Sequence, residues 1–150
     1  MADKPFSALR PDLIHYAANL EYNSSQIMRR VALAADQALV LATPVDTGRA
    51  RSNWQMSLYV PIDTVIEPYA YGAHGSTAAI NVTLALQQAK DAVQAHVSGV
   101  LIHLANNVEY MPALNAGHSA QAPALFIQKG VMAAVDAFNS IGAGILIRKL

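Results

Sequence analysis

The chain has 150 residues, of which 53% are hydrophobic and 13% charged, and its ten basic and ten acidic residues cancel. This length suits one domain with a real core, and the balanced charge argues against tight nucleic-acid binding, which needs neutralised phosphates. The absence of cysteine excludes disulfides and thiolate chemistry, and no apolar run reaches the length of a membrane span, so we expect a soluble intracellular protein with no membrane partner.

The low charge content is itself informative. Charged residues make up about half the fraction that is usual in soluble domains. Part of the surface is therefore expected to be covered by another protein, and a partner subunit is the simplest cover.

The first 42 residues predict an arm and two helices. Residues 1–10 read as a short, polar, flexible N-terminal arm without the apolar core of a signal peptide. A helix is expected over Pro11–Glu21, and a second over about Ser24–Ala42 with Asn23 as its cap. Asp36 falls towards the polar side of this second helix. Its apolar stripe consists of Ile27, Val31, Ala34, Ala38 and Leu41.

A strand and a long loop come next along the chain. Pro44 disfavours helical geometry at Thr43 and should end the helix there. Apolar and polar residues alternate over Trp54–Val60, which predicts a strand. Residues 61–80 form a long segment rich in Gly, Pro and Tyr. Loops of this length are usually functional, so we expect a docking loop.

The second half predicts a helix, a strand and a short helix. The helix spans about Val82–His96 with Asn81 as its cap. Gly99–Ala105 is apolar on both faces, as in a central strand. A short helix over Val108–Asn115 should end with Gly117 as its C-terminal cap.

The last helix is expected to begin at Pro123. Its predicted buried stripe consists of Ile127, Val131, Val135 and Phe138. Residues 145–150 fit either a short strand or an extension of the helix. Together the elements predict an α+β fold in which a small antiparallel or mixed sheet packs against three to four helices in a single domain, residues 1–150.

Asp46-Thr47-Gly48 is the short signature of aspartic proteases, in which two such aspartates share a proton. Here the Asp follows a helix end, and Arg49 would favour ionised carboxylates instead of a shared proton. The alternative is turn chemistry. Asp46 would accept backbone N–H groups two residues on, and Gly48 would adopt a positive φ.

The basic residues of this segment have two possible roles. Arg49 and Arg51 could pair with carboxylates such as Asp46, Glu67 or Glu109, or they could face nucleic acid. Trp54, at the head of the strand, is expected in the core.

The spacing of the histidines argues against a metal site. His103, Glu109 and His118 could form a two-histidine, one-carboxylate site, yet no histidine pair has helical i, i+4 spacing. We expect no metal, no cofactor and no catalytic residues.

Two separated segments resemble the tail-completion (head–tail joining, or neck) proteins of long-tailed bacteriophages. The first is Thr43–Trp54, TPVDTGRARSNW. The second is Ala105–Ser119, ANNVEYMPALNAGHS, followed by Gln121–Phe126, QAPALF. In both this chain and the family, the order is helix, motif, strand, variable middle, strand, Tyr-to-Gly segment and final helix.

The resemblance implies a structural virion protein of the neck that is not an enzyme. Copies would form a homo-oligomeric ring around the DNA channel, between head-side connector or stopper proteins and the tail terminator or tail tube. Double-stranded DNA would pass through without sequence-specific binding, and the protein would be made in the bacterial host cytoplasm.

The resemblance also suggests roles for particular residues. The candidates for a subunit interface or for the DNA lumen are Arg49, Arg51, Tyr110 and His118. The structural turn residues are Pro44, Asp46, Thr47, Gly48, Trp54, Gly117 and Pro123. A tail-terminator ring is the nearest alternative function. A small hydrolase that uses Asp46, or His103 with His118, is the remote one.

Overall fold

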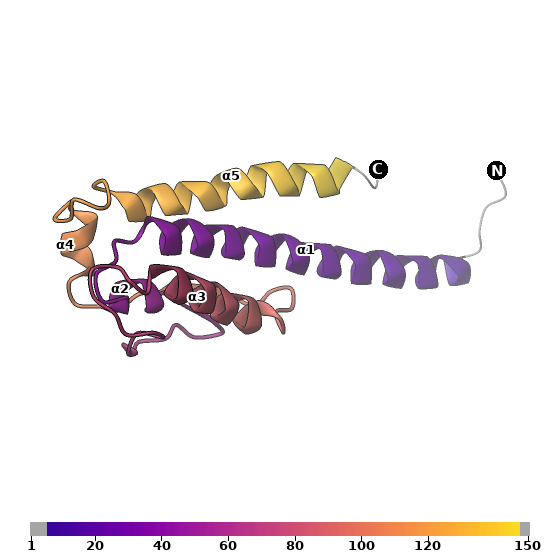
Figure 1. Ribbon diagram of the computed structural model, residues 1–150. Coiled ribbons are helices and arrows are strands. Elements are labelled where there is room, and N and C mark those ends of the chain that lie inside the picture. The colour runs from indigo at the N-terminus through magenta and orange to yellow at the C-terminus, as the bar shows by residue number, and fades with distance from the viewer. Residues whose placement is uncertain (1–5, 148–150) are drawn as a thin grey trace.

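Two long helices lie side by side and carry the rest of the chain at one end (Figure 1). The computed structural model describes residues 6–147. Helix α1 spans Phe6–Ala42, and helix α5 spans Phe126–Ile147 and runs antiparallel to it. The N-terminal part of α1 extends past the end of α5 (Figure 1). Residues 43–125, which we call the head, pack against the C-terminal half of α1.

The prediction of two helices within the first 42 residues is wrong, because α1 is continuous through Asn23 and Ser24. It begins at Phe6, so residues 6–10 of the expected flexible arm are helical and Pro11 lies inside the helix, not at its first position. The helix continues because Ser25 is buried and bonds outside it. The Ser25 hydroxyl lies 2.8 Å from the His96 carbonyl oxygen and 2.9 Å from His96 Nδ1. This tertiary contact outweighs the local preference for a cap.

His96 is the other half of this contact. It is 1% exposed, and its Nε2 donates to the Val100 carbonyl oxygen at 2.9 Å, because a carbonyl can only accept. The Arg29 guanidinium also donates to the His96 carbonyl oxygen. The middle of α1 is therefore fixed to the segment between helix α3 (Ala78–Val93) and strand β2 (Ile102–Ala105).

Helix α5 packs on α1 through small residues, not through its predicted stripe. A Cβ atom at Gly130 would lie 2.4 Å from Leu39 Cδ2, so glycine permits this close approach of the two helices. Phe126 is fully buried on the same side. The stripe prediction is wrong for Val131, Val135 and Phe138, which are 53%, 44% and 51% exposed. Its first member, Ile127, packs against the core.

The head contains three helices and a sheet of two antiparallel strands. The helices are α2 (Arg49–Ser52), α3 (Ala78–Val93) and α4 (Met111–Asn115). With α1 and α5 this gives five helices within residues 6–147, against the three to four expected. The predicted α+β class and single domain are confirmed.

The strands are shorter than expected. β1 spans Gln55–Leu58 and β2 spans Ile102–Ala105, with Met56 opposite Leu104. Trp54 and Met56 are buried as predicted, but Val60 is 68% exposed because the chain leaves the sheet at Tyr59, which has a φ of 70°. With two strands in the sheet, β2 is not a central strand.

A helix side chain covers the outer edge of β1. The Gln88 side chain of α3 accepts from the Met56 backbone N–H at 3.0 Å and donates to the Met56 carbonyl oxygen at 2.9 Å. In the antiparallel ladder these two backbone groups point away from β2, where a further strand would pair. The amide of Gln88 satisfies both of them.

The core consists of two clusters against α1. The larger comprises Leu39, Val40, Ala50, Trp54, Ala85, Met111, Ala122 and Phe126. The smaller comprises Met56, Ala89 and Val93. The predicted inner face of α3 is confirmed at Ala85, Ala89 and Val93, while Val82 and Leu86 are partly buried against the larger cluster.

The remaining helix boundaries differ from the predicted ones for identifiable reasons. Asn81 does not cap α3, because the helix begins at Ala78 and Asn81 is buried inside it. Helix α4 ends before Gly117, whose φ of 94° fits the predicted C-terminal cap. Helix α5 begins at Phe126 instead of Pro123, and Asn115 Oδ1 accepts the Ile127 N–H at its start. Of the predicted final segment, residues 145–147 are helical and 148–150 lie outside the described residues.

None of the helices within residues 6–147 combines the length and the apolar character needed to cross a membrane.

Asp36 is a buried carboxyl group on the side of α1 that faces the head. It is 0% exposed, and neither of its oxygens has a hydrogen-bond partner among the described residues. The prediction that it lies on a polar side is wrong, because the head covers that side of α1. Burial raises the pKa of Asp36 from 3.8 to about 7, and the charge of Asp36 adds to burial in raising the pKa of Tyr69.

The buried carboxyl group predicts a pH-dependent stability. The pKa of Asp36 is raised in the folded chain. Between the unfolded-state pKa of 3.8 and about pH 7, the folded chain therefore holds a proton on Asp36 that the unfolded chain has already lost. The free energy of unfolding should therefore fall as pH rises, by about 3 kcal/mol between pH 5 and pH 8 from this group. Urea unfolding of Asp36→Asn should lose this dependence, while the exposed control Asp63→Asn should keep it. Parallel curves for wild type and Asp36→Asn would refute the assignment.

Candidate functional site

Residues Thr43–Trp54, which we call the motif segment, begin where α1 ends. Thr43 Oγ1 donates to the Leu39 carbonyl oxygen at 2.7 Å and accepts from Trp54 Nε1 at 2.7 Å. One hydroxyl thus ends the helix and positions the indole in the core. Pro44 follows, buried, and α1 stops at Ala42 in agreement with the sequence.

Arg51 binds the C-terminus of α1. Its guanidinium donates to the Thr43 carbonyl oxygen at 2.6 Å and to the Leu41 carbonyl oxygen at 3.4 Å. A cation at this end of a helix also opposes the helix dipole. Burial lowers the pKa of Arg51. None of the three carboxylates expected for it is its partner, so within this chain its role is structural.

Gly48 turns the chain with a φ of 90°, as predicted. The close approach to Asn81 was not predicted: a Cβ atom at Gly48 would lie 2.2 Å from Asn81 Nδ2. Asn81 Oδ1 accepts from Ser52 Oγ and from the Ala70 N–H, both at 2.9 Å, and Nδ2 donates back to the Ala70 carbonyl oxygen at 2.9 Å. Glycine is therefore required at position 48 both for the turn and for this amide.

Asp46 binds a distant part of the chain, not its own turn. Its Oδ1 accepts from the His74 N–H at 2.8 Å, and its carbonyl oxygen accepts from the Gly75 N–H at 2.9 Å. The predicted bonds two residues on are not made by Asp46. A long contact of 3.5 Å from the Arg49 N–H to Thr47 Oγ1 takes that place.

The predicted docking loop is bound to its own chain at several points. Asn53 exchanges hydrogen bonds with the backbone of Ile66, each at 2.8 Å. Further along, Gln55 Nε2 donates to the Thr64 carbonyl oxygen and Asn107 Nδ2 to the Ile62 carbonyl oxygen, both at 2.8 Å. Such bonds replace secondary structure as the means of ordering this segment.

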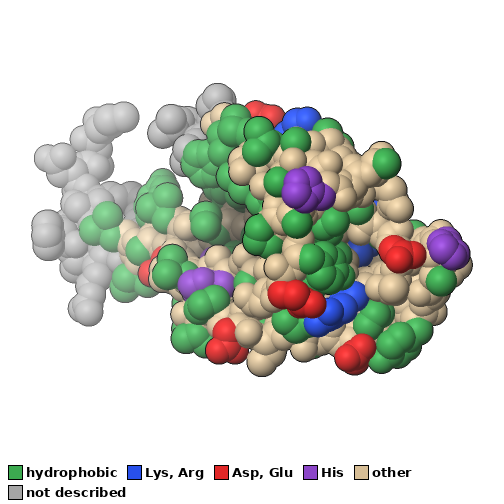
Figure 2. Space-filling view, turned by 90° about the vertical axis from the view of Figure 1, so that its left-hand side faces the viewer, with side chains coloured by type: hydrophobic (Ala, Val, Ile, Leu, Met, Phe, Trp, Pro, Cys, Tyr) green, Lys and Arg blue, Asp and Glu red, His purple; other side chains and the backbone are tan. Residues whose placement is uncertain are grey.

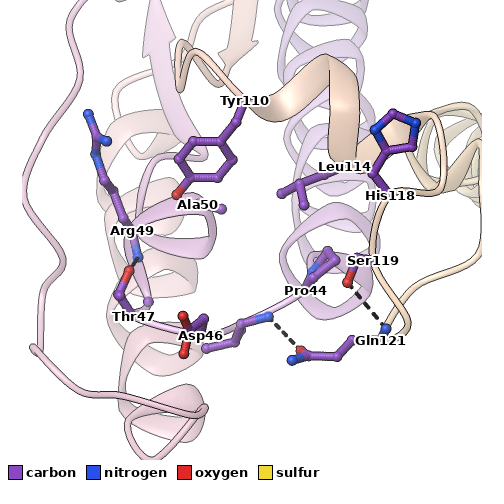
Figure 3. A pocket seen from close by; sticks show the side chains of 12 residues that line it. Pro44, Asp46, Thr47, Arg49, Ala50, Tyr110, Leu114, His118, Ser119 and Gln121 are labelled. Atoms are coloured by element: carbon purple, nitrogen blue, oxygen red, sulfur yellow. Dashed lines mark hydrogen bonds between the residues drawn. The ribbon is translucent and has the colours of Figure 1, made fainter.

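A cleft of about 520 Å³ lies between the motif segment and the segment that comes after β2 (Figure 3). One wall is the Pro44–Ala50 stretch. The other contains Tyr110, Leu114, His118, Ser119 and Gln121. Gln121 Oε1 accepts from the Val45 N–H at 2.9 Å and holds the two walls together. Seen from this end, the molecule carries side chains of both charge signs interspersed with hydrophobic ones (Figure 2).

Arg49 lies at the edge of this cleft. It forms an ion pair with Glu109 at 2.8 Å, one of the three carboxylates considered from the sequence, and its guanidinium lies 6.0 Å from the centre of the Tyr110 ring. The two charged side chains are 36% and 66% exposed, so the pair is open to solvent. A hydrogen bond from its own backbone and the Arg49 guanidinium lower the pKa of Glu109, while desolvation acts in the opposite direction.

Burial raises the pKa of Tyr110, and the charges of Glu109 and Asp46 act in the same direction while Arg49 opposes them. These effects reflect how closely the charged groups surround the ring. The cleft thus combines the Tyr110 phenol, the His118 imidazole, the Arg49 guanidinium and the Asp46 carboxylate with other polar and apolar side chains.

The fold brings together most of the predicted site residues. Lining the cleft are Pro44, Asp46, Thr47, Gly48, Arg49, Tyr110 and His118. Arg51, Trp54, Gly117 and Pro123 do not line it. Gln121, Leu114 and Ser119 also line the cleft but were not singled out as site residues, and a glutamine or serine in a loop carries no distinctive sequence signal.

The residues of the other proposed chemistries are arranged differently. His103 lies on β2 with its Nε2 3.2 Å from the Tyr59 carbonyl oxygen and does not line the cleft, whereas His118 does. Within residues 6–147, no group of three or more His, Asp or Glu side chains is placed to hold a metal ion.

Comparisons of the chain with protein-family models, with curated proteins and with solved structures give no match. A function for this chain is therefore inferred from the two segments that resemble tail-completion proteins and from the geometry of the cleft between them.

Replacing Gly48 tests the turn. Gly48→Ala should lower the free energy of unfolding by about 3 kcal/mol or more, because the positive φ and the contact with Asn81 act together. Gly99→Ala is the matched control, because Gly99 has a φ of 86° and open space around its Cβ position, and it should cost about 1–2 kcal/mol. Equal losses in urea unfolding would show that the Asn81 contact does not matter.

The two arginines should respond differently to truncation. Arg51→Ala removes the bonds to the end of α1 and should cost about 1–3 kcal/mol. Arg49→Ala removes an exposed ion pair and should cost less than about 1 kcal/mol. Thermal and urea unfolding of both variants provide the measurement, and a larger loss for Arg49→Ala would contradict the assigned roles.

Proposed function

We propose that this protein is a structural component of a bacteriophage neck, which completes the tail and joins it to the head as a homo-oligomeric ring around the DNA channel. One observation carries the proposal. The two segments that resemble tail-completion proteins are more than fifty residues apart in sequence, yet they form the opposing walls of one cleft. We infer that the two motifs act together as one surface of the folded protein.

The chemistry of the cleft supports binding to protein. Arginine and tyrosine are enriched at protein interfaces, and Arg49 and Tyr110 lie together at the edge of the cleft. Asp46 and Glu109 offset the guanidinium, so the cleft is not a cationic surface that would grip phosphates. We infer that Arg49 and Tyr110 contact a neighbouring copy or neck protein, and that the DNA passes without tight binding.

The proposed partners depend on this role. On the head side they are connector or stopper proteins, and on the tail side the terminator or tube. The protein would reside in the virion after synthesis in the host cytoplasm, without catalytic activity or cofactor. A tail-terminator ring is the alternative in the same structural class.

The proposed function predicts the phenotype of gene loss. Infection without this protein should give full heads and complete tails that do not join productively, and the wild-type gene supplied in trans should restore joining. Electron microscopy of the lysate provides the readout. Tails of abnormal length would support the terminator instead, and normal infectious particles would refute both.

Arg49 provides a residue-level test of the same proposal. Arg49→Ala should fold normally but lower the yield of joined particles in the complementation assay, while Lys90→Ala, an exposed cation on α3, should complement fully. Equal complementation by both variants would remove Arg49 from the proposed interface.

The remote alternative is a hydrolase that uses Asp46, or His103 with His118. It predicts hydrolytic activity of the purified chain that disappears in Asp46→Asn or in a histidine variant. Such a result would overturn the structural assignment.

A further inference from the structure

Helix α5 has two apolar faces, of which the fold uses one. Its 22 residues include two charged side chains, Lys129 and Asp136. An apolar face of a helix is normally buried against another element. The face with Gly130 packs against α1, whereas Val131, Val135 and Phe138 form a stripe along the flank of the helix, roughly a quarter turn from Gly130, and are about half exposed. We call this set the α5 stripe.

A second uncovered stripe lies on α1. Leu13, Tyr16 and Leu20 are spaced three and four residues apart, so they share one face, and they are 64%, 68% and 65% exposed. All of residues 13–22 are exposed. An isolated helical segment of this length is marginal in water, so a segment that is exposed throughout gains little support from packing. We call this set the α1 stripe.

The two stripes cannot cover each other within one molecule. Gly130 packs against Leu39, so the α5 stripe lies beside the C-terminal part of α1. Leu20 is nineteen residues before Leu39, about 28 Å along the helix axis at 1.5 Å per residue. Figure 1 shows the N-terminal part of α1 extending away from the head, and Figure 2 shows hydrophobic side chains gathered along the upper part of the molecule, at the height of α5.

We propose that a second copy of this chain covers both stripes, with the α1 stripe of one copy packed on the α5 stripe of the next. Pairing of α1 with α1, or of α5 with α5, would leave the other stripe bare in every copy. Head-to-tail pairing covers both with a single type of contact. Such contacts between different surfaces of identical copies propagate, and they close into a ring where the rotation permits.

The stripe side chains supply most of the area for such an interface. The six of them present about 700 Å², if a fully exposed large apolar side chain presents about 200 Å². A specific interface needs about 1,000 Å² or more in total, and the backbone and small side chains between these residues add to it. Near absence of charge on α5 further favours an apolar partner surface.

This inference rests on the proposed function for the closure of the ring and identifies the surfaces that would form it. The cleft between the two motif segments is a different surface, at the opposite end of α1 from the α1 stripe. Each can therefore be disrupted without changing the other.

The test uses two variants with complementary defects. Variant A carries Leu13→Lys and Leu20→Lys, and variant B carries Val135→Lys and Phe138→Lys. The control carries Ile80→Lys and Val97→Lys, which alter exposed apolar residues of the head outside both stripes. Circular dichroism and thermal unfolding establish that all three fold as the wild type does.

Sedimentation velocity at high micromolar concentration gives the assembly state. Wild type and control should form species larger than a dimer, whereas A and B separately should be monomers. An equimolar mixture of A and B should form dimers of twice the monomer mass and nothing larger, because the intact α1 stripe of B can pack on the intact α5 stripe of A.

Other outcomes overturn the proposal. Association of B alone with loss in A would indicate α1–α1 pairing, and the reverse would indicate α5–α5 pairing. Assembly of both variants, or a monomeric wild type, would show that these stripes do not mediate self-association.

Failure of this inference is separable from failure of the proposed function. If variants A and B both restore head–tail joining, the stripes are not the subunit contact but the neck function stands. If wild type assembles through the stripes while gene loss leaves joining intact, the function is wrong but the interface stands.

Discussion

The arrangement of the head depends on the buried amide of Asn81. Its oxygen accepts from Ser52 and from Ala70, and its nitrogen donates to Ala70 and Thr77, so one side chain joins α2, the long loop and α3. Gly48 passes directly over the same amide. A buried amide in which both ends are bonded is stabilising, but it becomes costly once a partner is removed. The position of the motif segment, and with it one wall of the cleft, is therefore set by this group.

The opposite wall is positioned by a different asparagine. Asn115 ends α4, accepts the Ile127 N–H at the start of α5 and receives the Leu125 N–H on its carbonyl oxygen. The turn between these helices holds Gln121 against Val45. The cleft thus lies between two short segments that are each fixed by side-chain amides. Both attach to the same end of the long helix pair, which also carries the exposed helix faces.

Local signals in the sequence predicted what local physics decides. The end of α1 before Pro44, the burial of Trp54 and Met56, the inner face of α3 and the cap at Gly117 all depend on backbone geometry or on simple periodicity. The predictions that failed depend on tertiary contacts. Asn23 was predicted to cap a second helix, but α1 continues through it because Ser25 bonds to His96, some seventy residues away.

The predictions for the candidate site divide in the same way into local features, which were confirmed, and tertiary contacts, which were not foreseen. Proline, aspartate and glycine correctly marked a turn, but the partner of Asp46 is His74, which no local rule identifies. On α5, both faces are apolar, so periodicity could not tell which one packs. The face that contains Gly130 packs against α1, because glycine lets the two helices approach closely. The face with the large side chains stays exposed to solvent. The residues that were wrongly predicted to be buried are therefore the ones that form the α5 stripe.

The Gln88 amide has a consequence for the behaviour of the chain before any assembly. It presents to β1 the donor and the acceptor that another strand would present, so this edge of the sheet is already paired by a side chain. Open strand edges are templates for ordered aggregation, in which chains add one after another through backbone hydrogen bonds. A single glutamine blocks that growth at β1 and leaves association there to side-chain surfaces, which can be specific.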